Sequence, residues 1–133
     1  MAVINWAFLC DYAFVDPAGK ASIIGKFDFI SFSQLPKRWP QMFVAIELQL
    51  QPDEMITIGT AITTPSGKTL ARLDTKTISG RGRKFIMPIG FYNVLFHEAG
   101  EHHIEIYVKD ISVHHIPFNV VLRSKEQSHQ KTE

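Results

Sequence analysis

Histidine is the residue type in this sequence with the clearest potential for metal or acid–base chemistry. Two adjacent pairs, His102–His103 and His114–His115, lie on what we expect to be neighbouring strands. Zinc requires three or four ligands that converge on one point. Neighbouring residues of a strand point to opposite faces, and the expected turn places His103 and His114 about four residues out of register, roughly 13 Å apart. The sequence therefore predicts structural or surface histidines, with no metal site and no cofactor.

Cys10 and Asp11 are the next candidates, because a thiol and a carboxylate can act as nucleophile and general base. Cys10 lies inside an expected strand, without the helix N-terminus or neighbouring cation that activates a thiol, so we expect it to be buried and unreactive. Asp11 interrupts an apolar strand and is expected to face Gly25, where a structural role is favoured over catalysis. No second carboxylate is placed to form an acid–base pair with it, so no catalytic residue is assigned.

The best local candidate for ligand binding is a glycine-rich basic loop, Ser79–Lys84. Its glycines allow backbone N–H groups to approach an anion, and arginine can bind phosphate through two hydrogen bonds. Arg81, Arg83 and Lys84 are the candidate residues for an anionic ligand, although a solvated, flexible hairpin tip is the favoured interpretation of this loop. Because no aromatic stacking platform is apparent among these basic residues, we expect no specific nucleic-acid partner.

The overall charge of the chain is nearly balanced, with 14 basic and 13 acidic residues and a formal charge of +1. Such a balance gives no general attraction to nucleic acid or to a membrane. The distribution is uneven, however, because residues 66–84 contain six lysines and arginines against one aspartate. The sequence therefore predicts a basic zone on an otherwise slightly acidic molecule.

The cysteine content and the hydropathy of the chain indicate its cellular compartment. Cys10 is the only cysteine, so no intrachain disulfide can form. The apolar N-terminal stretch is interrupted by Asn5 and Asp11 and lacks the basic segment and cleavage site of a secretory signal. No run approaches the roughly 20 apolar residues of a spanning helix. We therefore expect a cytoplasmic protein without a membrane partner.

The secondary-structure elements that position these residues are predicted to be strands. Turn signals recur about every dozen residues, and the segments between them are rich in β-branched and aromatic side chains. The pattern predicts one antiparallel two-sheet β-sandwich over residues 1–123, immunoglobulin-like with seven to nine strands, and a polar C-terminal tail at 124–133. Two prolines indicate a loop at Leu35–Pro40. A change of apolar parity in the final hairpin predicts a β-bulge near His114–His115.

The first expected hairpin is apolar on both faces. One face of its first strand carries four aromatic residues, Trp6, Phe8, Tyr12 and Phe14. A strand in a two-layer sandwich normally has one polar face, so something must cover the outer one. We expect a second copy of the chain to do so, giving a homodimer or another homo-oligomer. The alternative is that the loop at residues 32–41, with Trp39, folds over this face.

Two blocks of residues carry a family resemblance: Cys10–Ala13 with Asp16, Gly19–Lys20, Ser22–Gly25, Phe27–Asp28 and Ile30, and later Gly100 with Ile116–Val120. They resemble a family of small, uncharacterised bacterial β-sandwich proteins of unknown function. The first block is fairly specific, whereas the second is common in immunoglobulin-like hairpins. His102–His103 departs from the family, where an aromatic such as tyrosine is usual. The resemblance implies a bacterial origin and a fold, but no activity.

Two hypotheses about function follow from these patterns. The favoured one is a non-enzymatic binding or assembly module that self-associates through the first hairpin and receives an anionic group at the basic loop. The alternative is a hydrolase-like enzyme with a site built around Asp11 and the histidines, which requires those side chains to converge in one polar pocket.

Overall fold

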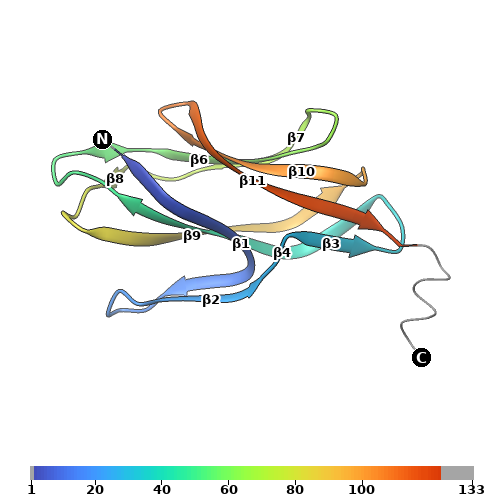
Figure 1. Cartoon of the computed structure of the whole chain (residues 1–133), viewed down its shortest axis with the longest axis horizontal. Helices are drawn as coiled ribbons and strands as arrows, with labels where there is room; N and C mark the ends of the chain where they lie inside the picture. Colours follow the sequence, from blue (N-terminus) through green and yellow to red (C-terminus); the bar gives the residue numbers. More distant parts are fainter. Residues whose placement is uncertain (1, 124–133) are drawn as a thin grey trace.

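The computed structural model describes residues 2–123, so the predicted tail at 124–133 lies outside the described residues. The described residues form eleven strands and no helix, and two of the strands are only two residues long (Figure 1). The predicted all-β, sandwich-like fold is therefore confirmed. Within this part of the chain, no helix is long and apolar enough to cross a membrane.

Two sheets form the body of the molecule, and we call them sheet A and sheet B. Sheet A has the order β2-β1-β4-β9, with bounds β1 Val3–Val15, β2 Ala21–Lys26, β4 Lys37–Gln49 and β9 Lys84–Phe96. Sheet B has the order β3-β11-β10-β6-β7, with bounds β3 Phe29–Phe32, β6 Ile58–Thr63, β7 Thr69–Asp74, β10 Gly100–Val108 and β11 Ile111–Leu122. The short strands β5 (Met55–Ile56) and β8 (Ile78–Ser79) pair with each other. All pairs are antiparallel except β3 with β11.

The main core lies between the two sheets and follows the period of two that the sequence predicts. In β4, every second residue is fully buried: Met42, Val44, Ile46 and Leu48. Sheet B supplies the opposite wall through alternate residues of β10 and β11, among them Ile104, Ile106 and Phe118. Each fully buried aliphatic side chain of this kind contributes about 1.5–3 kcal/mol to folding.

The region predicted as a loop at Leu35–Pro40 is partly a strand. β4 begins at Lys37 and continues through Pro40, with ladder partners in β9 on both sides of that proline. Proline is tolerated here because the pairing of β4 with β1 reaches only Phe43, so β4 has lost its second neighbour before Pro40. The prolines therefore mark the end of a paired region rather than the absence of a strand.

The bulge predicted in the final hairpin is present. Ile106 pairs with His114 and Tyr107 pairs with Ser112, which leaves Val113 as the extra residue beside the predicted pair of histidines. The hairpin turn itself consists of Lys109 and Asp110, both with positive φ. This geometry matches the twist of the flanking strands. The extra residue explains why the apolar set changes parity between the two ends of β11.

Strand β1 does not stay in the plane of sheet A. It pairs with β4 as far as Cys10, and beyond that point pairs only with β2. The segment from Tyr12 to Lys26, which we call the β1–β2 arm, folds back beneath the outer face of sheet A (Figure 1). Ala13 and Ile23 of the arm pack against a second apolar cluster on that outer face: Cys10, Phe43, Ala45 and Ile86.

The bend of β1 is built from Asp11 and Gly25. Gly25 has φ +67°, and its backbone lies so close to the Asp11 carboxylate that a Cβ atom there would collide with it. The predicted pairing of these two residues is therefore confirmed. The Asp11 carbonyl accepts a hydrogen bond from Gln41 Nε2 at 3.2 Å, and the Leu9 carbonyl accepts one from Phe27 N–H at 3.0 Å. These contacts hold the arm at its base.

His102 occupies a core position. Its ring is fully buried and packs against Phe96 and Phe118, with ring centroids 5.4 Å away in each case. Nδ1 donates to the Gly100 carbonyl at 3.0 Å, whereas Nε2 has no hydrogen-bond partner. Burial lowers the pKa of His102, against smaller opposing effects of that carbonyl and of the Glu98 carboxylate. The folded protein therefore holds this imidazole neutral.

We expect this histidine to make the protein less stable in acid. Below about pH 6.5 the unfolded chain binds a proton that the folded protein excludes, so the free energy of unfolding falls as pH falls, by up to about 1.4 kcal/mol per pH unit. His102→Phe should remove this part of the slope, because phenylalanine fills the same aromatic site. Thermal melts between about pH 5 and 8 measure it, with exposed His115→Gln as control. Equal pH slopes for the parent and His102→Phe would contradict the assignment.

Candidate functional site

The two predicted histidine pairs lie on β10 and β11 of sheet B. His102 is buried, whereas His103 lies on the opposite face of β10, as the sequence predicts. His103 contacts His115 across the β10–β11 pair, with ring centroids 5.5 Å apart, and its Nε2 lies 3.3 Å from the Glu101 carboxylate. The sequence reasoning missed this contact because it compared His103 with His114 and not with the diagonal neighbour on the same face. Among residues 2–123, no three His, Cys, Asp or Glu side chains are grouped to hold a metal.

Cys10 and Asp11 also stay apart from the histidines. Cys10 is fully buried under the arm, and its Sγ lies 3.6 Å from the Phe43 carbonyl. Burial first, and the neighbouring Asp11 carboxylate second, raise the pKa of this thiol to about 11, so it is a poor nucleophile. Asp11 lies exposed at the bend of β1, in sheet A, while the paired histidines belong to β10 and β11 of sheet B. The structure therefore does not bring Asp11 and these histidines together.

The aromatic residues predicted for self-association lie on β1, on two sides of the bend. Trp6 and Phe8 stack on each other at 5.0 Å, and the Lys26 ammonium lies 5.2 Å from the Phe8 ring centroid. Tyr12 and Phe14 belong to the arm, where each is about 40% exposed. The arm packs Ala13 and Ile23 on the outer face of sheet A, so the chain itself covers part of that face.

The alternative cover, the loop with Trp39, is not present. The Trp39 ring lies edge-on to Phe32 at 5.6 Å and packs against the core between the sheets. The inward side of the arm is covered by sheet A through Ala13 and Ile23, while Tyr12, Phe14 and Ile24 on it remain 39–53% exposed.

The predicted anion-binding loop is only partly free to bind. The Gly80 N–H donates to the Glu54 carbonyl at 2.8 Å, and its Cα is pressed against the Gln51 carbonyl. This glycine therefore serves packing rather than ligand approach. At Gly82, which has φ +68°, a Cβ would meet only the Pro52 side chain, at 3.6 Å. The three predicted basic residues, Arg81, Arg83 and Lys84, are all exposed, and Arg81 stacks over the Phe85 ring at 4.6 Å.

A hollow of about 560 Å³ lies beside this loop, and we call it the loop hollow. The end of the arm contributes one wall through Val15, and the start of β9 contributes another. Its cationic groups are Lys76 and Arg81. The remaining lining residues are hydroxyl, glycine and apolar residues: Thr75, Thr77, Ile78, Ser79, Gly80, Phe85, Ile86, Met87 and Pro88. Cations beside an apolar floor suit a ligand with both anionic and apolar parts.

A second hollow, of about 660 Å³, follows along β9 and lies between that strand and β7. We call it the strand hollow. Arg38 lines it, and one guanidinium nitrogen of Arg38 donates a hydrogen bond to the Asn93 carbonyl at 2.8 Å. Asn93 itself has φ 54°, an irregular point in β9. The other lining residues come from β7, β9 and the turn after β9: Thr69, Leu70, Ala71, Leu73, Gly90, Phe91, Tyr92, Val94, Leu95 and His97.

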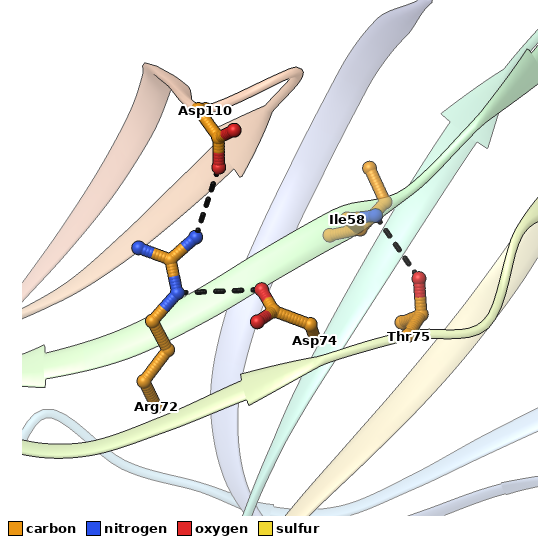
Figure 2. Close-up of polar contacts among 5 residues, drawn as sticks. All are labelled: Ile58, Arg72, Asp74, Thr75 and Asp110. Atoms are coloured by element: carbon orange, nitrogen blue, oxygen red, sulfur yellow. Dashed lines mark hydrogen bonds and ion pairs between the residues drawn. The ribbon is translucent and has the colours of Figure 1, made fainter.

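The strand hollow lies where edge strand β7 of sheet B faces edge strand β9 of sheet A, and the loop hollow lies between the start of β9 and the loop that follows β7. Both hollows therefore border β9. We call the surface that they form along β9 the open side. The loop between the two strands is anchored where β7 ends, because Thr75 Oγ1 accepts from Ile58 N–H at 3.0 Å and Thr75 N–H donates to the Ile58 carbonyl (Figure 2). This anchoring fixes the start of the basic loop against the core of sheet B.

Arg72 is the one cation of the basic zone that the structure neutralises through two ion pairs. Its guanidinium lies 3.3 Å from the Asp74 carboxylate and 3.4 Å from that of Asp110, and Figure 2 shows it between them. It also stacks over the Tyr107 ring at 4.7 Å. Within the described residues, the remaining cations of the zone form no ion pair of this kind, so the basic character belongs to the loop and to the neighbouring hollows.

The sequence signalled only part of this site. The charge run at residues 66–84 located the basic zone, and Arg81 was among the predicted residues. Arg38 and Tyr92 were missed, because they lie far from that run in sequence and reach the open side only through the pairing of β4 with β9. No local pattern marks either residue, so the hollows could not be predicted.

Fold and site together define an all-β sandwich with a basic, hollowed open side. The chain belongs to DUF6941, a family of unknown function, whose model matches residues 5–121. No match was found among curated proteins. The chain is also similar to a solved structure, that of Pseudomonas fluorescens alkylpurine DNA glycosylase AlkC bound to DNA containing an abasic site analog, with TM-score 0.55 and 15% identity. The match covers 90% of this chain and 30% of the glycosylase chain.

The comparison with the glycosylase corrects the predicted partners. We expected no specific nucleic acid, and a structural neighbour of this chain is a protein bound to DNA. The homo-oligomer has no support among the matches. The expectation was based on the absence of an aromatic residue among the basic ones, and in the folded protein Tyr92 and Arg38, which are distant in sequence, line the same hollow.

Proposed function

We propose that this protein is a non-enzymatic binding module for nucleic acid, with the open side as its binding surface. The observation that carries the proposal is the arrangement of the two hollows along β9, each lined by apolar residues with at least one arginine beside them. A polyanion can extend along such a surface and place its phosphates on the cations. The predicted cytoplasmic location agrees with such a ligand.

Electrostatics supports this choice of ligand. Residues 66–84 carry six basic residues and one acidic residue, and Arg38 joins them from β4. Because the Arg72 charge is satisfied by Asp74 and Asp110, the cations left for a ligand are those of the loop and the hollows. Phosphate neutralisation by lysine and arginine supplies most of the affinity in nucleic-acid binding without sequence preference.

The structural neighbour gives independent support. The glycosylase of similar fold is bound to DNA, although the present chain spans only 30% of it. The activity of that enzyme is not transferred here, since the likeness concerns the fold. The non-enzymatic part of the proposal is supported by the separation of Asp11 from the paired histidines and by the elevated pKa of the Cys10 thiol.

The predicted anion-binding residues provide the test. Fluorescence anisotropy with a labelled oligothymidylate should show that the double variant Arg81→Ala, Arg83→Ala binds roughly 25-fold more weakly at about 0.1 M salt. This figure assumes two lost phosphate contacts, which should also lower the slope of log affinity against log salt by about 1.4. Lys84→Ala, added to the double variant, should weaken binding further.

A matched control removes the same charge elsewhere. Lys26→Ala with Lys109→Asn eliminates two positive charges that line neither hollow, and asparagine tolerates the φ of 52° at position 109. We expect this variant to bind within about two-fold of the parent. Equal losses in both double variants would show a general charge effect, and unchanged binding in Arg81→Ala, Arg83→Ala would contradict the proposed surface.

A further inference from the structure

We infer that the ligand of the open side is a single strand, whose unpaired bases enter the strand hollow against Tyr92 while its phosphates lie on the bordering arginines. This inference rests on the proposed function and narrows it to a substrate class. The supporting observation is the mostly apolar lining of the strand hollow, whereas a double helix would require a charged surface.

The strand hollow is apolar where a duplex would need charge. Its lining includes Leu70, Leu73, Val94 and Leu95, whereas Arg38 is its one Lys or Arg lining residue. A duplex presents phosphates and sugars on its outside and keeps the faces of its bases stacked, so it leaves an apolar hollow unfilled. Unpaired bases can leave their stack and bury their flat faces on aromatic and aliphatic side chains.

Tyr92 is the residue best suited to receive a base. Its side chain is 60% exposed although it belongs to a central part of β9, and it lines the strand hollow. The ring is held by Phe43, at 5.9 Å and almost perpendicular, and Gly90 next along the same face leaves space for that contact. On the β7 side, Leu73 is 40% exposed. Tyr92 and Leu73 both line the strand hollow, and the Tyr92 ring lies on the same face of sheet A as Phe43. An exposed aromatic ring bordering an apolar hollow can stack on an unpaired base.

Charge complementarity determines which occupant fits this apolar surface. Arg38 is held at the strand hollow by the Asn93 carbonyl at 2.8 Å, a contact that uses one of its three guanidinium nitrogens. Farther along β9, Arg81 stacks over Phe85 at 4.6 Å in the loop hollow. Each hollow thus combines an arginine with an aromatic ring, the pairing that binds a phosphate and a base of the same strand.

The test compares a short oligothymidylate with the same oligonucleotide annealed to oligodeoxyadenylate. We expect the parent protein to bind the single strand at least ten-fold more tightly than the duplex. Tyr92→Ala should weaken single-strand binding roughly five- to hundred-fold and leave duplex binding unchanged, and Tyr92→Phe should retain the affinity of the parent. Tyr107→Ala, which removes a tyrosine on the outer face of sheet B, serves as the matched control.

A second readout does not depend on the folding of any variant. Photo-crosslinking of the parent protein to oligothymidylate containing 5-iodouracil should label Tyr92, as mapped by mass spectrometry of the peptides. Equal affinity for single strand and duplex, or crosslinks that map only outside the strand hollow, would overturn the inference. In that case the proposed function still stands if Arg81→Ala, Arg83→Ala weakens binding, whereas absence of binding to either nucleic acid contradicts the proposed function itself.

Discussion

Iodoacetamide is expected to modify Cys10 at least about 100-fold more slowly in the native protein than in the denatured chain. Two physical effects combine. The thiol is fully buried beneath the β1–β2 arm, and its pKa of about 11 leaves roughly one thiol in a thousand ionised at about pH 8. Mass spectrometry of samples quenched over time measures the rate directly, because Cys10 is the only cysteine of the chain.

The denaturant dependence of this rate reports how the thiol becomes accessible. Cys10 lies between the arm and sheet A, so opening of the arm alone is sufficient to expose it. We therefore expect slow modification with little dependence on urea at low concentration, because a local opening exposes little surface. Modification as fast as in the denatured chain would show that the arm does not cover Cys10 in solution.

Gly25→Ala is expected to lower the free energy of unfolding by about 2–4 kcal/mol. Part of this loss comes from the positive φ of 67°, which an L-residue adopts at a cost of about 1–2 kcal/mol. The remainder comes from collision of the new Cβ with the Asp11 side chain, whose Cγ and Cβ lie 2.8 and 3.1 Å from its position. Urea unfolding measures the loss, and faster alkylation of Cys10 should accompany it as the arm loosens.

Gly19→Ala separates the cost of a positive φ from the cost of the collision with Asp11. Gly19 also has a positive φ, of 86°, but no atom lies within 4 Å of a Cβ placed there. It should therefore lose only the backbone contribution, about 1–2 kcal/mol. Asp11→Ala removes the Asp11 carboxylate, so adding it to Gly25→Ala should recover a large part of the difference in a double-mutant cycle. Equal losses at the two glycines would contradict the steric role of Asp11.

The arm also contributes to the proposed binding surface. Val15, at the end of β1, lines the loop hollow together with Arg81. The position of the arm therefore sets the shape of one of the two hollows. The close approach of Asp11 to Gly25 at its base is a structural reason for the glycine, and the exposed position of Asp11 allows a carboxylate in an otherwise apolar strand.

The linear pattern of residues was sufficient for the fold class and for several local features. Alternation with a period of two, as in β4, predicts strands because successive side chains leave opposite faces of a pleated backbone. The bulge in the last hairpin was also predictable, since a change of apolar parity requires one extra residue, found at Val113. The single cysteine and the charge run at 66–84 likewise required no structure.

Tertiary structure alone decided where the apolar hairpin packs and where the candidate ligand surface lies. A strand with two apolar faces shows that a cover exists, but a second copy, a loop and the chain's own arm satisfy that pattern equally. The bend at Asp11 and Gly25 brings the arm onto sheet A. Its direction depends on the φ angle of Gly25, which the alternation of apolar residues does not predict. Arg38, Leu73 and Tyr92 meet because β4 pairs with β9 and β7 faces it, and such long-range pairing is settled by packing of the whole sandwich.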